Sequence, residues 1–148
     1  MASCKELKEL TRSRLQSART LMNAQDWEAA AYMMGYVLET LLKSASCKAL
    51  HLEQYPDDRS KHQEKVLSFF MTHNFDQLLY ISGLSDVFNS SFFSWAQFTT
   101  SYLGDWPRMR YDVKVLKQFD EIKVNQLYDY LYKADDSIIK TVQKMRRW

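Results

Sequence analysis

Glycine and proline are scarce in this chain, and that scarcity constrains the fold more than any other feature of the sequence. The 148 residues include 3 glycines and 2 prolines, about a third of the share that these two turn-forming residues have in an average protein. Sandwiches, barrels and propellers need many tight turns, so they are disfavoured. The glycines also lie too far apart for a glycine-rich phosphate-binding loop. The sequence therefore indicates a helical chain without the common nucleotide-binding loop motifs.

Length, charge and cysteine content are those of an ordinary globular protein. One domain covering residues 1–148 is expected at this length. The 20 basic and 18 acidic residues give a formal net charge of +2, too small by itself to indicate a nucleic-acid or membrane partner. No apolar run reaches the roughly 18 residues that a membrane span needs, and the charged start differs from a signal peptide. We expect a cytoplasmic protein without membrane contact, in which Cys4 and Cys47 are free thiols.

Apolar residues at helical spacing predict two long helices near the start of the chain. The first covers residues 4–23, and Asp26 is a suitable N-cap for a second helix over residues 27–50. The short link between them predicts an antiparallel hairpin. The main apolar stripe of the second helix consists of Trp27, Ala31, Met34, Leu38, Leu41 and Ala45.

Capping residues and apolar spacing predict the later helices. Ser60 and Gln63 form a capping-box pattern before a helix that ends near residue 71, and Asn74 begins a short helix that Gly83 ends. Ser85 is the expected N-cap of a helix that extends to about residue 104 and carries an aromatic ridge of Phe88, Phe92, Trp95, Phe98 and Tyr102. A near-heptad pattern predicts a final helix over residues 127–145. The predicted fold is an all-α, up-and-down bundle of four long helices plus one or two short helices.

Charged residues on the first helix do not follow its packing pattern. Arg14 falls in the middle of the apolar stripe formed by Leu7, Leu10 and Ala18. Its guanidinium then pairs with a carboxylate, or reaches water past a packed stem, or lies on a face open to water or to a second subunit. The basic residues of the opposite side are either solvated surface or a line of phosphate contacts; they are Lys5, Lys8, Arg12 and Arg19.

The second helix carries a second face, turned away from its main stripe. Tyr32, Tyr36, Glu39 and Lys43 lie on this face, and Glu39 precedes Lys43 by one helical turn, the favourable order for an ion pair. This pattern is typical of a mid-helix salt bridge beside half-buried tyrosines. It is equally typical of a dimer seam or a ligand groove.

Two arginines occur in an aromatic segment late in the chain. Arg108 and Arg110 lie between Trp106 and Tyr111, and guanidinium groups beside aromatic rings suit phosphate contact and stacking. Pairing of one arginine with Glu39 is the alternative. The three histidines of the chain provide no spacing that requires a metal site or a catalytic triad. We therefore expect no metal and no cofactor.

Three short motifs occur in a recognisable order along residues 4–147. They are the alanines at 29–31 with Glu39 and Lys43, the segment Thr72-His73-Asn74-Phe75 with Leu78 and Leu79, and the dipeptide Arg110-Tyr111. Together they resemble the motifs of HEPN domains (higher eukaryotes and prokaryotes nucleotide-binding). Asp112 departs from the pattern, since the family frequently has proline at that place.

The resemblance implies a helical bundle that dimerises around a groove on the two-fold axis. Many members are metal-independent ribonucleases, toxins or antiphage effectors, often encoded with a nucleotidyltransferase antitoxin. Their catalytic signature is an arginine followed four to six residues later by a histidine, which serves in proton transfer. Neither Arg108 nor Arg110 has a histidine at that spacing, and no histidine follows His73. The general base is therefore missing from the place where the family keeps it.

We therefore expect a HEPN-like, non-catalytic homodimer that binds RNA, a nucleotide or a protein partner in a toxin–antitoxin or antiphage defence setting. The predicted site consists of the ligand-binding residues Arg110, Arg108, Glu39, Lys43 and Tyr36 and of the interface residues Arg14 and Tyr32. One alternative is a divergent metal-independent ribonuclease in which Arg110 binds the scissile phosphate and His73 transfers the proton. Another alternative is a module that only binds proteins.

Overall fold

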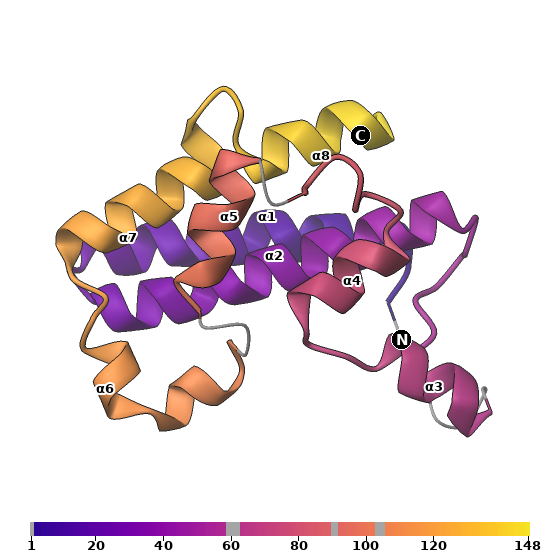
Figure 1. Ribbon diagram of the computed structural model, residues 1–148, viewed down its shortest axis with the longest axis horizontal. Helices are drawn as coiled ribbons and strands as arrows, with labels where there is room; N and C mark the ends of the chain where they lie inside the picture. Colours follow the sequence, from indigo (N-terminus) through magenta and orange to yellow (C-terminus); the bar gives the residue numbers. More distant parts are fainter. Residues whose placement is uncertain (1, 59–62, 90–91, 103–105) are drawn as a thin grey trace.

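The computed structural model describes residues 2–58, 63–89, 92–102 and 106–148. These residues contain helices and no β-strand, which confirms the predicted all-α class (Figure 1). In chain order the elements are α1 (Cys4–Asn23), α2 (Trp27–Ala49), α3 (Glu64–Phe70), α4 (Phe75–Ile81), α5 (Phe93–Thr100), the 3-10 helix η1 (Arg108–Tyr111), α6 (Val113–Leu116), α7 (Glu121–Tyr128), the π-helical turn η2 (Asp129–Lys133) and α8 (Ile138–Arg146).

The first two helices form the predicted antiparallel hairpin. Ser3 begins α1 with a full capping box, in which the Glu6 amide donates to the Ser3 hydroxyl and the Ser3 amide donates to the Glu6 carboxylate. The Asp26 carboxylate accepts from the amide of Ala29, 3.3 Å away, and so caps α2 as expected. Thr11 on α1 donates to Thr40 on α2 at 2.9 Å, which joins the two helices near their middle.

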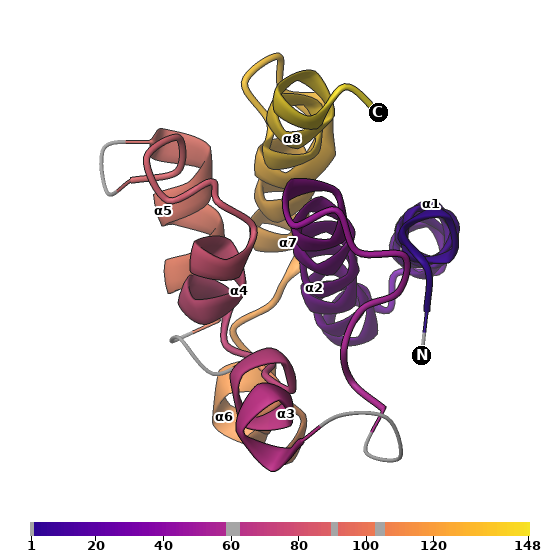
Figure 2. The same ribbon diagram turned by 90° about the vertical axis from the view of Figure 1, so that its right-hand side faces the viewer.

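Helix α2 lies at the centre of the molecule. Figure 2 shows α1 on one side of α2 and α4 and α5 on the other, with α7 and α8 along a third side. Met34, Leu38, Leu41 and Leu42 on α2 are completely buried, and each buried side chain of this size contributes about 1.5–3 kcal/mol of hydrophobic free energy. Because neighbours cover α2 on several sides, its second face is also partly buried.

Of the helix caps predicted in the middle of the chain, some are confirmed, one is wrong and one lies outside the described residues. Asn74 caps α4 by accepting from the amide of Gln77, and Gly83 follows α4 with a left-handed φ of +71°, both as expected. Ser60 lies outside the described residues, and α3 begins after Gln63 without a side-chain cap. The prediction for Ser85 is wrong, because residues 85–89 form turns and α5 begins at Phe93.

The aromatic ridge does not lie on one long helix. Trp95 and Phe98 are buried on α5, whereas Phe88 precedes the helix and Tyr102 follows it. The rings still cluster, since Phe88 and Trp95 have centroids 5.3 Å apart. The rings therefore pack together in the core although they do not all belong to one helix, and their spacing in the sequence does not by itself show a continuous helix. The expected end of this helix at Gly104 lies outside the described residues.

The predicted final helix over residues 127–145 is wrong in its middle. Helix α7 passes into the π-helical turn η2, and Ala134 then adopts an extended backbone with ψ of 152°. Ser137 caps the separate helix α8 by accepting from the amide of Lys140 at 3.3 Å. Met145, expected on the buried stripe, is 46% exposed. Only α1 and α2 among the described helices are long, so the expected count of four long helices is also wrong.

Buried acidic groups make the fold sensitive to alkali. Burial raises the pKa of the Cys47 thiol to about 11 and raises the pKa values of the Tyr55 and Tyr102 phenols above their usual range. The unfolded chain ionises these groups at lower pH, so the free energy of unfolding is intact below about pH 9 and falls as the pH rises further.

We expect the urea midpoint to be lower at about pH 10.5 than at about pH 8, with a smaller fall in a Cys47→Ala variant. Equal midpoints at the two pH values for the parent chain would contradict the burial of these groups.

Candidate functional site

A buried carboxylate on α2 forms the centre of the predicted site. Glu39 is 5% exposed, and its Oε1 lies 2.9 Å from the Nζ of Lys43. The Nδ1 of His73 lies 3.0 Å from each oxygen of the same carboxylate. A carboxylate at this depth needs charged or hydrogen-bonding partners, because its burial is otherwise costly. The three residues are called the Glu39 cluster below.

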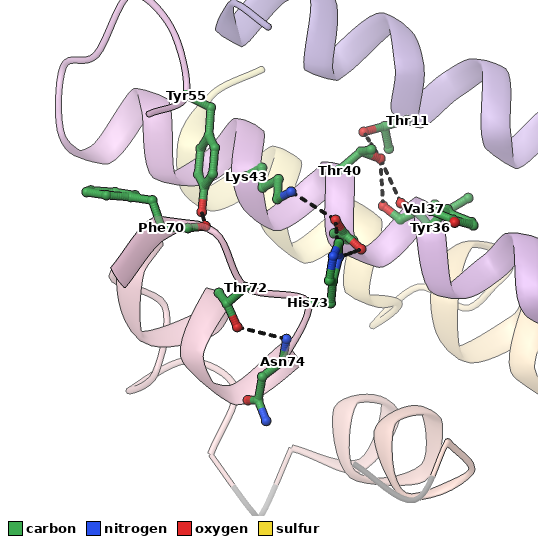
Figure 3. Close-up of polar contacts among 11 residues, drawn as sticks. Thr11, Tyr36, Val37, Thr40, Lys43, Tyr55, Phe70, Thr72, His73 and Asn74 are labelled. Carbon is green, nitrogen blue, oxygen red and sulfur yellow. Dashed lines mark hydrogen bonds and ion pairs between the residues drawn. The ribbon is translucent and has the colours of Figure 1, made fainter. Parts of the chain in front are cut away.

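The chain positions the Glu39 cluster from two directions. Lys43 follows Glu39 by one turn of α2, whereas His73 comes from the segment before α4, where Figure 3 shows it pointing at the same place on α2. The Thr72 hydroxyl accepts from the amide of Asn74 at 3.1 Å, and Asn74 caps α4. This tight turn holds the imidazole against α2 while 62% of the His73 side chain stays exposed.

An aromatic cluster lies one turn away from Glu39 on the same face of α2. The hydroxyls of Tyr32 and Tyr36 are 3.2 Å apart, and both rings contact the buried ring of Trp106, with centroids 5.3 and 4.5 Å away. Trp106 is 1% exposed. Tyr32 and Tyr36 therefore anchor the segment that leads to Arg108, and much of their ring surface is used inside the molecule.

A groove between α1 and α2 brings four of the predicted site residues together. Its volume is about 1030 Å³, and Arg14, Tyr36, Glu39 and Lys43 all line it. The other lining residues are Ala2, Glu6, Leu7, Glu9, Leu10, Ser13, Met33, Thr40 and Asp57. This surface is called the α1/α2 groove below.

The position of Arg14 differs from the expected middle of the buried stripe. The buried residues of α1 are Leu7, Thr11 and Ala18, whereas Leu10 is 36% exposed and Arg14 is exposed. The Thr11 hydroxyl lies 2.8 Å from the carbonyl oxygen of Leu7 and 2.9 Å from the hydroxyl of Thr40, so this polar residue faces α2 with hydrogen-bond partners in reach. This rotates the packed face of α1 away from Leu10 and Arg14. Of the alternatives for Arg14, its exposure agrees with a face open to water or to a second subunit, and its role at an interface stays a prediction.

The charge of the α1/α2 groove is negative. Glu39 and Lys43 neutralise each other, which leaves the carboxylates of Glu6, Glu9 and Asp57 against the guanidinium of Arg14. Glu6 also keeps its charge to low pH, since the hydrogen bonds from Ser3 lower its pKa. The sequence reasoning missed the carboxylates of this groove, because Asp57 and the two glutamates come together only when α1 packs on α2.

Arg108, one of the two predicted arginines of the late segment, does not line the α1/α2 groove. Arg108 is exposed on η1 and lines a separate pocket of about 390 Å³. The other lining residues of this pocket are Tyr102, Met109, Tyr111, Asp112, Val113, Lys114 and Val115. Arg110 belongs to η1, but its side chain lies outside the described part of the structure. In the described structure Glu39 pairs with Lys43 and His73, while a Glu39–Arg110 pair stays untested.

Metal-binding residues do not gather in the described ranges. No group of three or more histidine, cysteine, aspartate or glutamate side chains there is arranged to hold a metal ion. Cys4 and Cys47 are both free thiols. None of the described helices is both long and apolar enough to cross a bilayer.

Comparison of the chain with protein-family models, with curated proteins and with solved structures gives no match.

Proposed function

We propose that this chain is a non-catalytic binding module of the HEPN-like kind, and that its α1/α2 groove binds a basic amphipathic helix of a protein partner. The observation that supports the proposal most is the composition of the groove. It combines an apolar floor with an excess of carboxylates, beside four side chains that the sequence pattern had selected as functional.

The floor of the groove suits the apolar side of a helix. Leu10 and Met33 are only partly covered, and the half-buried Tyr36 lines the same groove. Amphipathic helices bind in such grooves through apolar residues that recur every three or four positions. Glu9 and Asp57 can then face lysine or arginine side chains at the edges of the bound helix, which favours association and sets its orientation.

The same carboxylates disfavour a polyanion in this groove. A nucleic-acid backbone would bring its phosphates close to Glu6, Glu9 and Asp57, and among the described residues of the groove lining the only cation besides the paired Lys43 is Arg14. RNA or nucleotide binding through Arg108 and Arg110 stays a prediction for the separate surface at η1. A second copy that packed groove against groove would add a further excess of carboxylates, so we favour a basic partner there.

The biological setting follows from the resemblance alone. A toxin–antitoxin or antiphage role, a nucleotidyltransferase-type partner and a homodimer all remain proposals. Light scattering of the purified chain tests the homodimer, and the gene beside this one tests the partner.

A synthetic peptide provides a direct test of the α1/α2 groove. We expect a labelled helical peptide of about 14 residues, with leucines on one face and lysines on the other, to bind, and its glutamate counterpart not to bind. Glu9→Lys should weaken binding of the lysine peptide about three- to tenfold. Asp86→Lys makes the same change in net charge at an exposed turn and should leave the affinity unchanged. Equal affinity in the Glu9 variant and the parent, measured by fluorescence anisotropy, would refute the proposal.

One observation favours ribonuclease activity as a second candidate function. The buried carboxylate of Glu39 orients the His73 imidazole, and most of that side chain is open to solvent. A carboxylate that fixes one ring nitrogen leaves the other free to accept a proton, as a general base must.

Incubation of a mixed RNA with the chain in EDTA decides between the two functions. We expect no cleavage, since the arginine–histidine signature of the resembled ribonucleases is missing from the sequence. Cleavage by the parent that disappears in both His73→Gln and Arg110→Ala would replace the non-catalytic proposal. Cleavage that persists in both variants would indicate a contaminating nuclease.

A further inference from the structure

A second pocket lies on the opposite edge of α1 from the groove. Its volume is about 280 Å³, and it lies between α1, the π-helical turn η2 and α8. The polar and aromatic side chains that line it are Thr11, Arg12, Gln16, Arg19, Tyr132, Gln143 and Trp148.

The charge of this pocket is opposite to that of the α1/α2 groove. No aspartate or glutamate is among the described residues that line it, and neither Arg12 nor Arg19 forms an ion pair within the described ranges. Further cations border its aromatic walls. The Nζ of Lys8 lies 5.0 Å from the centre of the Trp148 ring, and that of Lys140 lies 6.0 Å from the centre of the Tyr132 ring.

The Trp148 side chain lines the pocket and also carries a buried hydrogen-bond donor. The indole nitrogen of Trp148 is shielded from solvent and has no acceptor in the described part of the chain. A nitrogen shielded from solvent is also shielded from a molecule in the pocket, so Trp148 contributes aromatic surface to the site and not this donor. Gln16 and Gln143 add side-chain amides to the same lining.

We propose that this pocket binds a small phosphate monoester that carries a flat ring. Arg12 and Arg19 would hold the phosphate, because guanidinium groups offer forked donors that match phosphate oxygens. Trp148 and Tyr132 provide aromatic surface for the ring, and the volume is near the lower limit of small-molecule sites. The site shares no lining residue with the Glu39 cluster or with the α1/α2 groove, although both surfaces include residues of α1.

Titration calorimetry of the full chain with uridine monophosphate tests the proposal, with uridine and inorganic phosphate as separate probes. We expect the monophosphate to bind more tightly than either part. Arg12→Ala and Arg19→Ala should each weaken its binding about tenfold or more. Arg14→Ala is the matched control, since Arg14 is an exposed arginine of the same helix that faces the other groove.

A nuclear magnetic resonance measurement locates the ligand independently. The indole N–H signal that is absent in a Trp148→Phe variant should shift when the monophosphate is added to the parent chain. Absence of saturable binding, an unmoved Trp148 signal, or equal loss of affinity in the Arg14 variant would overturn the proposal. Inorganic phosphate that binds as tightly as the monophosphate would overturn it as well, because the ring would then have no site.

Discussion

Replacement of Trp106 with alanine is expected to lower the free energy of unfolding by about 3–5 kcal/mol. Trp106 is 1% exposed, and its ring contacts those of Tyr36 and Tyr32 and stacks parallel to that of Phe75 at 6.1 Å. Alanine would leave a cavity between α2 and α4 that these rings cannot fill without moving. Urea unfolding followed by circular dichroism measures the loss.

Gly35 on α2 lies against the Trp106 ring, so a substitution at Gly35 tests the same contact. A Cβ atom at residue 35 would lie 2.5 and 2.8 Å from two carbons of the Trp106 ring, closer than atoms can approach. Gly35→Ala should therefore cost about 1–3 kcal/mol through overpacking. In the double variant the alanine methyl group enters space that the indole has left, so its cost should be smaller than the sum of the single costs.

Phe93→Ala is the control for both variants, since Phe93 is 60% exposed and its loss should change stability far less. Additive costs in the Gly35 and Trp106 pair would mean that the two residues are not in contact. Because Trp106 leads directly to η1, the same variants are expected to disturb the surface that carries Arg108.

The Glu39–Lys43 pair should show strong coupling. Glu39→Leu leaves the Lys43 ammonium, whose side chain is only 13% exposed, without its carboxylate, and Lys43→Met leaves the Glu39 carboxylate with His73 alone. Glu39→Leu is expected to lose about 3 kcal/mol, because it leaves an unpaired charge in a largely buried place, and Lys43→Met should lose less, because the Nδ1 of His73 stays 3.0 Å from the carboxylate. Replacement of both residues removes both charges and should restore much of that loss.

Urea unfolding followed by circular dichroism compares the variants of this pair. His73→Ala is included because His73 is the other partner of the Glu39 carboxylate. His73→Ala should cost less than either single variant, since most of the imidazole is exposed. Single variants within about 0.5 kcal/mol of the parent would contradict the buried pair, because exposed ion pairs contribute no more than about 1 kcal/mol.

Local sequence signals predicted the helices whose ends depend on a few neighbouring residues. Asp26 and Asn74 each cap the expected helix, and Gly83 adopts the left-handed backbone that ends one. Such caps act within one helical turn, so they can be recognised without the rest of the fold. Ser85 shows the limit of that approach, because a residue suited to capping does so only if tertiary packing places a helix after it.

Periodicity failed where packing follows another path. The spacing of residues 127–145 suits one helix, but Ser137 is completely buried and begins α8 with its own cap. The chain turns back after η2 so that Ile138, Ile139 and Val142 reach the core. A repeat of apolar residues cannot distinguish one long helix from two shorter ones that bury the same side chains.

In the candidate site, too, some contacts follow from the sequence and others depend on the tertiary structure. Sequence alone determined the Glu39–Lys43 pair, because both residues lie on one helix at a fixed spacing. The approach of His73 to Glu39, the packing of Trp106 on Tyr36 and the exposure of Arg14 were decided only by the tertiary structure. These contacts join segments far apart in the chain, or depend on how α1 is rotated against α2. Helix geometry determines which side chains meet within one or two turns of a helix. The contacts between distant segments are determined by the burial of apolar and charged groups over the whole molecule.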